Sequence, residues 1–146
     1  MSFFRSIDIS ATGLTAQRMR MDVIAENIAN VSTTRTASGT PYRRRYVEFQ
    51  PMDQPAFGQY LEAAKSDEPA GVGVKVSAIK EDTSDFKLVY DPSNADAGAD
   101  GYVRYPNVDL AVEMTDVISA QRAYEANVTA LNAMKAMAMK ALEIGT

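Results

Sequence analysis

The sequence predicts an α+β fold in which long N- and C-terminal helices pair as a coiled-coil-like hairpin around a small, irregular, β-rich middle domain. Apolar residues recur with the seven-residue spacing of paired helices near both ends of the chain. The middle instead holds all six Pro and six of the eight Gly, with short runs of alternating apolar and polar residues. We therefore expect three segments, namely residues 1–34, 35–106 and 107–146.

The N-terminal helix is predicted to run from Phe3 to about Val31, where β-branched and short polar residues begin to favour extended or turn conformations. Gly13 costs this helix about 1 kcal/mol relative to Ala. It therefore implies either close approach of another helix or a hinge used in docking. The predicted heptad seam contains Ile7, Ser10, Leu14, Gln17, Met21, Ile24, Ile28 and Val31, and all of these except Ser10 and Val31 are also expected at subunit interfaces.

The C-terminal helix is predicted from about Asn107 to Ile144, with Asn107 as its N-cap and Gly145 after its last apolar residue. Its apolar residues alternate steps of four and three, which is again a heptad pattern. The predicted seam contains Leu110, Met114, Val117, Gln121, Tyr124, Val128, Leu131, Lys135, Ala138 and Leu142, and all of these except Lys135 and Ala138 are also expected at subunit contacts.

The middle segment is predicted to contain strands near residues 46–49, 72–76 and 86–90, and a flexible insertion near residues 50–70. The run Tyr42 to Tyr46 combines three Arg with two Tyr, a mixture that nucleic-acid surfaces also use. Because the run is short and leads into a strand pattern, we favour ion pairs with the acidic middle segment of this or an adjacent subunit.

The predicted helices are too long for a compact globule of this size. At 1.5 Å per residue they extend to about 40 Å and about 50 Å, whereas such a globule has a radius of gyration of about 15 Å. Projecting helices leave apolar side chains uncovered, and such surface usually belongs to a partner. The side chains expected in this surplus are Ile9, Met19, Val23, Ile118, Met134, Met137 and Met139.

Both seams contain the tripeptide Ala-Gln-Arg, which places Gln17 and Gln121 at equivalent heptad positions. Polar seam residues lower stability but can fix register. In an antiparallel hairpin the two amides could bond within the seam or to a neighbouring subunit.

The composition argues against an enzyme. The chain has no His and no Cys, so it lacks a side chain that titrates near neutral pH, a thiolate nucleophile and a sulfur ligand for metals. The acidic run Asp91 to Gly101 fails as a calcium loop, because its register lacks the final Glu and places Arg104 at a ligand position. We predict no catalytic, cofactor or metal site, and no nucleic-acid binding, since the middle of the chain is acidic.

Neither a secretory signal pattern nor a membrane-spanning apolar run is apparent, which suggests a cytoplasmic protein or export by an unusual route. Two function classes remain open on these grounds. One is a structural assembly subunit, and the other is a cytoplasmic coiled-coil adaptor that binds a partner through its helical hairpin.

Residues 11–34 read ATGLTAQRMRMDVIAENIANVSTT and resemble the N-terminal signature of bacterial flagellar rod, hook and hook-associated proteins. Residues 101–108 and 119–128, reading GYVRYPNV and SAQRAYEANV, are similar to the C-terminal signature of the proximal rod proteins of that family. Residues 41–45 and 90–93 also match its middle region. Asn94 stands where the family usually has a His, which bears only on a metal role there.

The resemblance implies a structural subunit of the basal-body proximal rod, which lies in the periplasm and transmits motor torque to the hook. It implies terminal helices in an inner tube, with helical assembly alongside other copies, other rod proteins and the adaptor between the export gate and the MS ring. It also implies passage through the flagellar type III export apparatus, without a cleaved signal peptide and without spanning the membrane. Absent cysteines suit an unfolded chain that enters an oxidising compartment.

Overall fold

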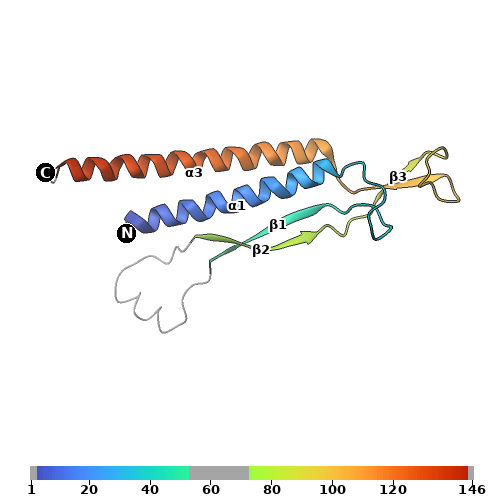
Figure 1. Cartoon of the computed structure of the whole chain (residues 1–146), viewed down its shortest axis with the longest axis horizontal. Coiled ribbons are helices and arrows are strands. Elements are labelled where there is room, and N and C mark those ends of the chain that lie inside the picture. The colour runs from blue at the N-terminus through green and yellow to red at the C-terminus, as the bar shows by residue number, and fades with distance from the viewer. Residues whose placement is uncertain (1–2, 53–72, 145–146) are drawn as a thin grey trace, which may run out of the picture. The chain divides into compact units, whose positions relative to one another are not determined.

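The computed structural model describes residues 3–52 and 73–144, and within them it contains two helices and four strands (Figure 1). The α+β class predicted from the sequence is confirmed. The predicted insertion near residues 50–70 lies almost entirely outside the described residues. The elements in chain order are α1 (Phe3–Ala29), β1 (Arg45–Pro51), β2 (Val74–Glu81), β3 (Lys87–Tyr90), β4 (Tyr102–Tyr105) and α3 (Leu110–Ile144).

Helix α1 continues without a break through Gly13 and ends at Ala29, close to the predicted end. The Asn30 side chain donates a hydrogen bond to the Glu26 carbonyl, and the Val31 N–H bonds to the carbonyl only three residues back. These bonds tighten the last turn and satisfy carbonyl groups that have no partner within a regular helix.

Helix α3 begins later than predicted, at Leu110, because Asp109 is its N-cap. The Asp109 Oδ1 atom accepts the N–H of Ala111 at 3.0 Å and that of Val112 at 3.5 Å. A side-chain oxygen at this position satisfies N–H groups that the first turn leaves without intrahelical partners. The prediction that Asn107 caps the helix was wrong, since Asn107 bonds instead to the middle segment.

The four strands form two separate two-stranded sheets, β1 with β2 and β3 with β4. In the first sheet, the Asp82 N–H donates to the Arg44 carbonyl beyond one end and the Met52 N–H donates to the Gly73 carbonyl at the other. Strands β3 and β4 are antiparallel, with Val89 opposite Val103. Three strands were predicted near their observed places, whereas β4 was missed because four residues with a central Arg give little periodicity.

The chain divides into two compact units, and each helix contributes to both. The first contains Met1–Met19, Phe49–Ser77 and Ala120–Thr146, and the second contains Arg20–Glu48 and Ala78–Ser119. The division expected from the sequence, at residues 34 and 106, remains a prediction.

In the first unit, α1 approaches α3 closely at Gly13. A Cβ atom on Gly13 would lie 3.2 Å from Asn127 Oδ1, which favours the close-approach explanation of this glycine over a hinge. Thr12 anchors the start of β2, because its Oγ1 accepts the Val74 N–H at 3.2 Å. Gly73 has a φ of 104°, and a Cβ there would lie 2.5 Å from the same Oγ1, so this contact requires glycine.

In the second unit, a small core joins the end of α1, the start of α3 and the middle segment. Its buried apolar side chains include Val23, Ile24, Tyr42, Val103 and Val108. The prediction that Val23 belongs to the surplus exposed surface was wrong, because its side chain packs inside this unit. Two polar residues, Asn27 and Glu113, are also fully buried there, and their contacts define the site described next.

A buried polar hub and the candidate assembly surface

Asn27, Tyr42, Arg44 and Glu113 form a hydrogen-bonded cluster in the second unit, which we call the polar hub. Asn27 is 0% exposed and uses its whole hydrogen-bonding capacity. Its Nδ2 donates to the Arg45 carbonyl at 2.8 Å and to Glu113 Oε2 at 3.0 Å. Its Oδ1 accepts the Arg45 N–H and the Tyr42 hydroxyl, each at 2.9 Å. One amide therefore joins α1, α3 and the segment entering β1.

Glu113 places a carboxylate in the core, and partners on two sides compensate for its loss of water. It is 0% exposed, and its Oε1 accepts the Arg44 Nε at 2.5 Å while Oε2 accepts from Asn27. Burying an ionised carboxylate is costly unless charged and polar partners replace water. Arg44 also reaches Asp116 at 3.5 Å, and Asp116 accepts a hydrogen bond from Arg20 at 2.9 Å. These contacts hold the two helices and the middle segment in one register.

Burial raises the pKa of the Tyr42 hydroxyl, and the nearby carboxylate of Glu26 raises it further. The hydroxyl therefore stays protonated around neutral pH and remains available to donate to Asn27. This state suits a structural hydrogen bond.

Asn107 forms hydrogen bonds that connect the segments flanking the strands of the middle region. Its Oδ1 accepts the Arg44 N–H at 2.8 Å, and its Nδ2 donates to Ser84 Oγ at 2.8 Å. The neighbouring Arg43 guanidinium lies 4.4 Å from the centre of the Phe86 ring, in a cation–π arrangement. Hydrogen bonds from Ser84 lower the pKa of the Asp82 carboxyl, and the nearby Arg44 lowers it further. Together these contacts fix the loop that follows β2.

Two of the three adjacent arginines form ion pairs, while Arg43 donates hydrogen bonds to the carbonyls of Asp82 and Ser84. Arg44 pairs mainly with α3, while Arg45 contacts Glu26 of α1 at 3.0 Å and Glu81 of β2 at 3.6 Å. Their partners within the chain thus lie on the helices as well as in the acidic middle.

The seam predicted for α1 follows the helix face that is covered within the chain. Ile24 is buried, and the other seam residues with described side chains are half-buried; these are Ile7, Ser10, Leu14, Gln17, Met21, Ile28 and Val31. Their role at a subunit interface remains a prediction.

Half of the seam residues predicted on α3 are exposed, and several covered residues lie one position earlier in the sequence. Val117, Tyr124, Val128, Leu131 and Ala138 are half-buried, whereas Leu110, Met114, Gln121, Lys135 and Leu142 are exposed. The covered positions instead include Glu113, Ala120, Asn127 and Met134. Small and polar residues occupy this side, so hydrophobicity alone selects the wrong heptad positions. The exposed members other than Lys135 remain predicted contacts with other subunits.

The two seam glutamines do not bond to each other in the structure. Gln121 Nε2 donates to Glu125 Oε1 one turn further along α3, at 3.1 Å. Gln17 Oε1 is buried and has no hydrogen-bond partner. No bond joins the two amides within the chain, and a bond from either of them to a neighbouring subunit stays a prediction.

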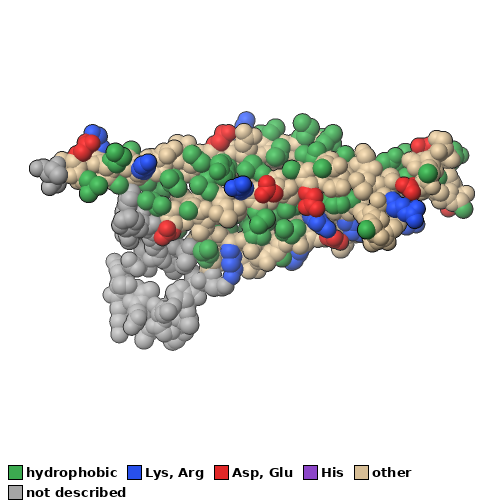
Figure 2. All heavy atoms as spheres, in the orientation of Figure 1, with side chains coloured by type: hydrophobic (Ala, Val, Ile, Leu, Met, Phe, Trp, Pro, Cys, Tyr) green, Lys and Arg blue, Asp and Glu red, His purple; other side chains and the backbone are tan. Residues whose placement is uncertain are grey.

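Exposed apolar side chains on α3 form the candidate assembly surface. Figure 2 shows hydrophobic side chains gathered over the helices on the visible face. In the second unit, Leu110, Met114 and Ile118 are spaced by four residues, so they share a face of the helix, and each is roughly half exposed. In the first unit, Met137, Met139 and Leu142 are still more exposed. Apolar surface of this extent on a helix usually belongs to a partner.

Within residues 3–52 and 73–144, no cluster of acidic side chains could hold a metal ion. The Asp91 to Gly101 run folds as turns, in which Asp91 Oδ1 accepts the Ser93 N–H and hydroxyl, and Asn94 Oδ1 accepts the Asp96 N–H. Neither described helix is long and apolar enough to cross a membrane.

Sequence reasoning missed the polar hub. The available signal was Asn27 itself, which lies on the apolar face of α1 beside the buried residues Val23 and Ile24. A buried amide on such a face must find partners, because an unsatisfied polar group is costly. The identity of those partners, 15 to 86 residues away, required the tertiary structure.

Paired helices, a hub that ties the middle segment to them and an exposed apolar helix face are the features of a structural subunit. Comparison with known proteins agrees. A family profile for the flagella basal body rod protein matches residues 7–35, and one for the C-terminal region of the flagellar basal body rod FlgEFG proteins matches residues 99–144.

Similarity to individual relatives extends over the whole chain. The flagellar basal-body rod protein FlgC of Bacillus subtilis is 53% identical, with 99% of each chain covered. The FlgC protein of Borreliella burgdorferi is 48% identical over 99% of this chain and 98% of its own length. The FlgC protein of Salmonella typhimurium is 39% identical over 99% of each chain. The chain belongs to the FlgC family of flagellar basal-body rod proteins. It is accordingly a structural component of the flagellar basal body and not an enzyme, which favours the rod subunit over the cytoplasmic adaptor.

Proposed function

We propose that this chain is a subunit of the proximal rod and packs through the exposed apolar face of α3 against copies of itself and other rod proteins. The observation that carries the proposal is the row Leu110, Met114 and Ile118, which remains about half exposed after the chain has folded. Burying apolar surface stabilises an assembly by about 25 cal/mol per Å². An α3 face of this kind therefore favours assembly over the free chain.

The residues of this surface suit a rod in which one chain meets several different neighbours. Met137 and Met139 are unbranched and flexible, so they can adapt to non-identical partner surfaces. In a helical array each subunit presents different surfaces to its successive neighbours, and the contacts repeat without closing into a dimer. Torque passing toward the hook would be shared among many such contacts.

The polar hub would carry load within each subunit. It links α1, α3 and β1 through a buried, fully bonded amide and a charge-assisted pair, contacts with little freedom to slide. A force applied to the middle segment would thereby reach the helices that contact neighbouring subunits.

The remaining partners and the location follow from membership of the family. We expect passage through the flagellar type III export apparatus without a cleaved signal peptide, and a final position in the periplasmic part of the rod. We also expect contact with the adaptor between the export gate and the MS ring. The absence of Cys supports this route, because a chain that enters an oxidising compartment unfolded then forms no incorrect disulfides.

The test is a charged substitution on the α3 face. Met114→Lys combined with Ile118→Lys should abolish swimming and remove the chain from purified basal bodies, while circular dichroism of the isolated protein stays unchanged. The matched control, Thr115→Lys with Ser119→Lys, places the same charges on exposed positions one residue further along and should retain more motility. Full motility and normal incorporation of the first variant would refute the proposed assembly face.

A further inference from the structure

The β3–β4 ribbon presents an exposed face that lies outside the candidate assembly surface on α3. Side chains alternate along a strand, so Leu88 and Tyr90 of β3 share a face with Tyr102 and Arg104 of β4. Leu88 and Tyr90 are each 65% exposed, and Tyr102 is 48% exposed. The opposite face holds Val103, which is 0% exposed and anchors the ribbon in the second unit.

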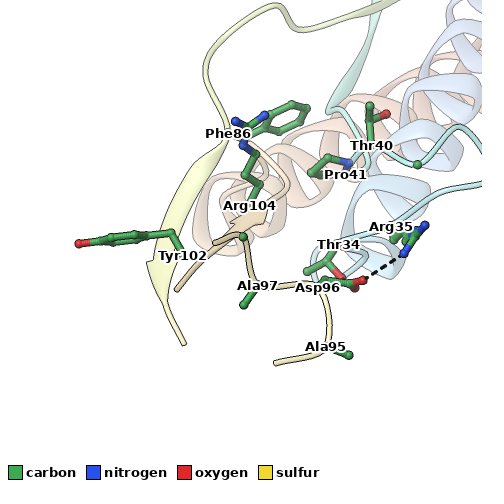
Figure 3. Close-up of a pocket in the computed structure, with 12 residues that line it drawn as sticks. Thr34, Arg35, Thr40, Pro41, Phe86, Ala95, Asp96, Ala97, Tyr102 and Arg104 are labelled. Atoms are coloured by element: carbon green, nitrogen blue, oxygen red, sulfur yellow. Dashed lines mark hydrogen bonds and ion pairs between the residues drawn. The ribbon is translucent and has the colours of Figure 1, made fainter. Parts of the chain in front are cut away.

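The ribbon face borders a cavity of about 450 Å³ in the same unit. Figure 3 shows Arg104 pointing toward Phe86 on one side of this cavity, while Arg35 and Asp96 lie together on another side. Thr34 donates a hydrogen bond to the Asp96 carboxylate at 2.7 Å. Aromatic, aliphatic and arginine side chains around a concavity are the composition that protein–protein contacts favour.

Arg104 has no acidic partner among the described residues, unlike Arg35, Arg44 and Arg45. Arg35 lies 3.8 Å from Asp96, Arg44 pairs with Glu113, and Arg45 pairs with Glu26. A guanidinium beside an aromatic ring can bind an incoming carboxylate through two parallel hydrogen bonds. The missing counterpart is therefore an acidic side chain, carried on a segment that can also cover Leu88 and Tyr90.

The chain itself contains a segment of this chemistry. Residues 60–69 read YLEAAKSDEP, with Tyr60 and Leu61 followed by Glu62, and with Asp67 and Glu68 further along. We infer that the surface formed by Leu88, Tyr90, Tyr102 and Arg104, with the adjoining cavity, receives residues 60–69 of a second copy. This inference rests on the proposed assembly of copies in the rod. Joining two different surfaces of successive copies would extend the array without closing it.

Disulfide cross-linking tests this contact directly, because the natural chain has no Cys. Ala97→Cys on the cavity wall and Ala63→Cys in the acidic segment are combined in cells that make only this variant. The two cysteines can bond only if their Cα atoms come within about 7 Å. Oxidised basal bodies should yield dimers and larger ladders on non-reducing gels, whereas either single substitution should yield monomer.

Charge variants show whether Arg104 recognises the acidic segment. Adding Arg104→Glu should lower the cross-linking yield at least 10-fold, and adding Glu62→Arg as well should restore much of it. Arg18→Glu, an exposed charge reversal on α1, is the matched control and should leave the yield unchanged. Arg104→Gln removes the charge but keeps a polar side chain without introducing a negative charge, and it should also lower the yield.

The outcomes separate this contact from the proposed function. If the double-cysteine chain is present in basal bodies but does not cross-link, the contact is refuted while the rod assignment stands. A disulfide within one chain, or a link to a different protein, also refutes a second copy as the occupant. Absence of even the unsubstituted chain from basal bodies would instead refute the proposed function.

Discussion

Removing the Asn27 amide should destabilise the protein more than any other single polar substitution outside the Arg44–Glu113 ion pair. Asn27→Ala breaks four hydrogen bonds and leaves the Arg45 N–H and carbonyl, the Tyr42 hydroxyl and Glu113 Oε2 without that partner. At about 1 kcal/mol per bond, the loss is about 4 kcal/mol. The free energy of unfolding of a native protein is only about 5–15 kcal/mol, so this loss is a large fraction of it.

The assay is urea denaturation of the purified chain, followed by circular dichroism. The matched control is Asn30→Ala, which removes two side-chain hydrogen bonds, one to the Glu26 carbonyl and one from the Thr33 hydroxyl. It should cost about 2 kcal/mol or less. If Asn27→Ala proves too unstable to purify, Tyr42→Phe removes only one of the four bonds and should cost about 1 kcal/mol. A free energy of unfolding for Asn27→Ala within about 0.5 kcal/mol of the unsubstituted value would refute the hub as described.

Two further predictions concern local contacts. Gly73→Ala should destabilise the protein by about 1–3 kcal/mol, because the new Cβ meets Thr12 Oγ1 at a positive φ; Gly39→Ala is the control, since it also has a positive φ but open space around it. A smaller loss for Gly73→Ala than for Gly39→Ala in urea denaturation would contradict the Thr12 contact. The Asp82 carboxyl, whose pKa Ser84 lowers, should contribute stability above its unfolded pKa of about 3.9, and this contribution should disappear as the pH falls through the lower folded value. Carboxyl NMR titration should give a depressed Asp82 pKa that rises in Ser84→Ala; an ordinary value in the unsubstituted chain would contradict the observed hydrogen bonds.

The sequence by itself determined the parts of the protein that depend on local periodicity and composition. Heptad spacing predicted both long helices, and alternation predicted three of the four strands, because helix and strand periods are properties of neighbouring residues. The absence of His and Cys excluded thiolate and histidine chemistry. The motif in residues 11–34 indicated the flagellar axial family, to which the comparisons also assign the chain.

Only the tertiary structure decided which helix faces are covered and by what. Heptad spacing placed Met114 and Gln121 in the α3 seam, whereas the structure covers Glu113 and Ala120 instead. Glu113 can be buried because Arg44 and Asn27, 69 and 86 residues earlier in the chain, supply its partners. Such compensation depends on positions in space, which a one-dimensional pattern does not encode. The same limit explains why Asp109 rather than Asn107 caps α3, since Asn107 is engaged by Arg44 and Ser84.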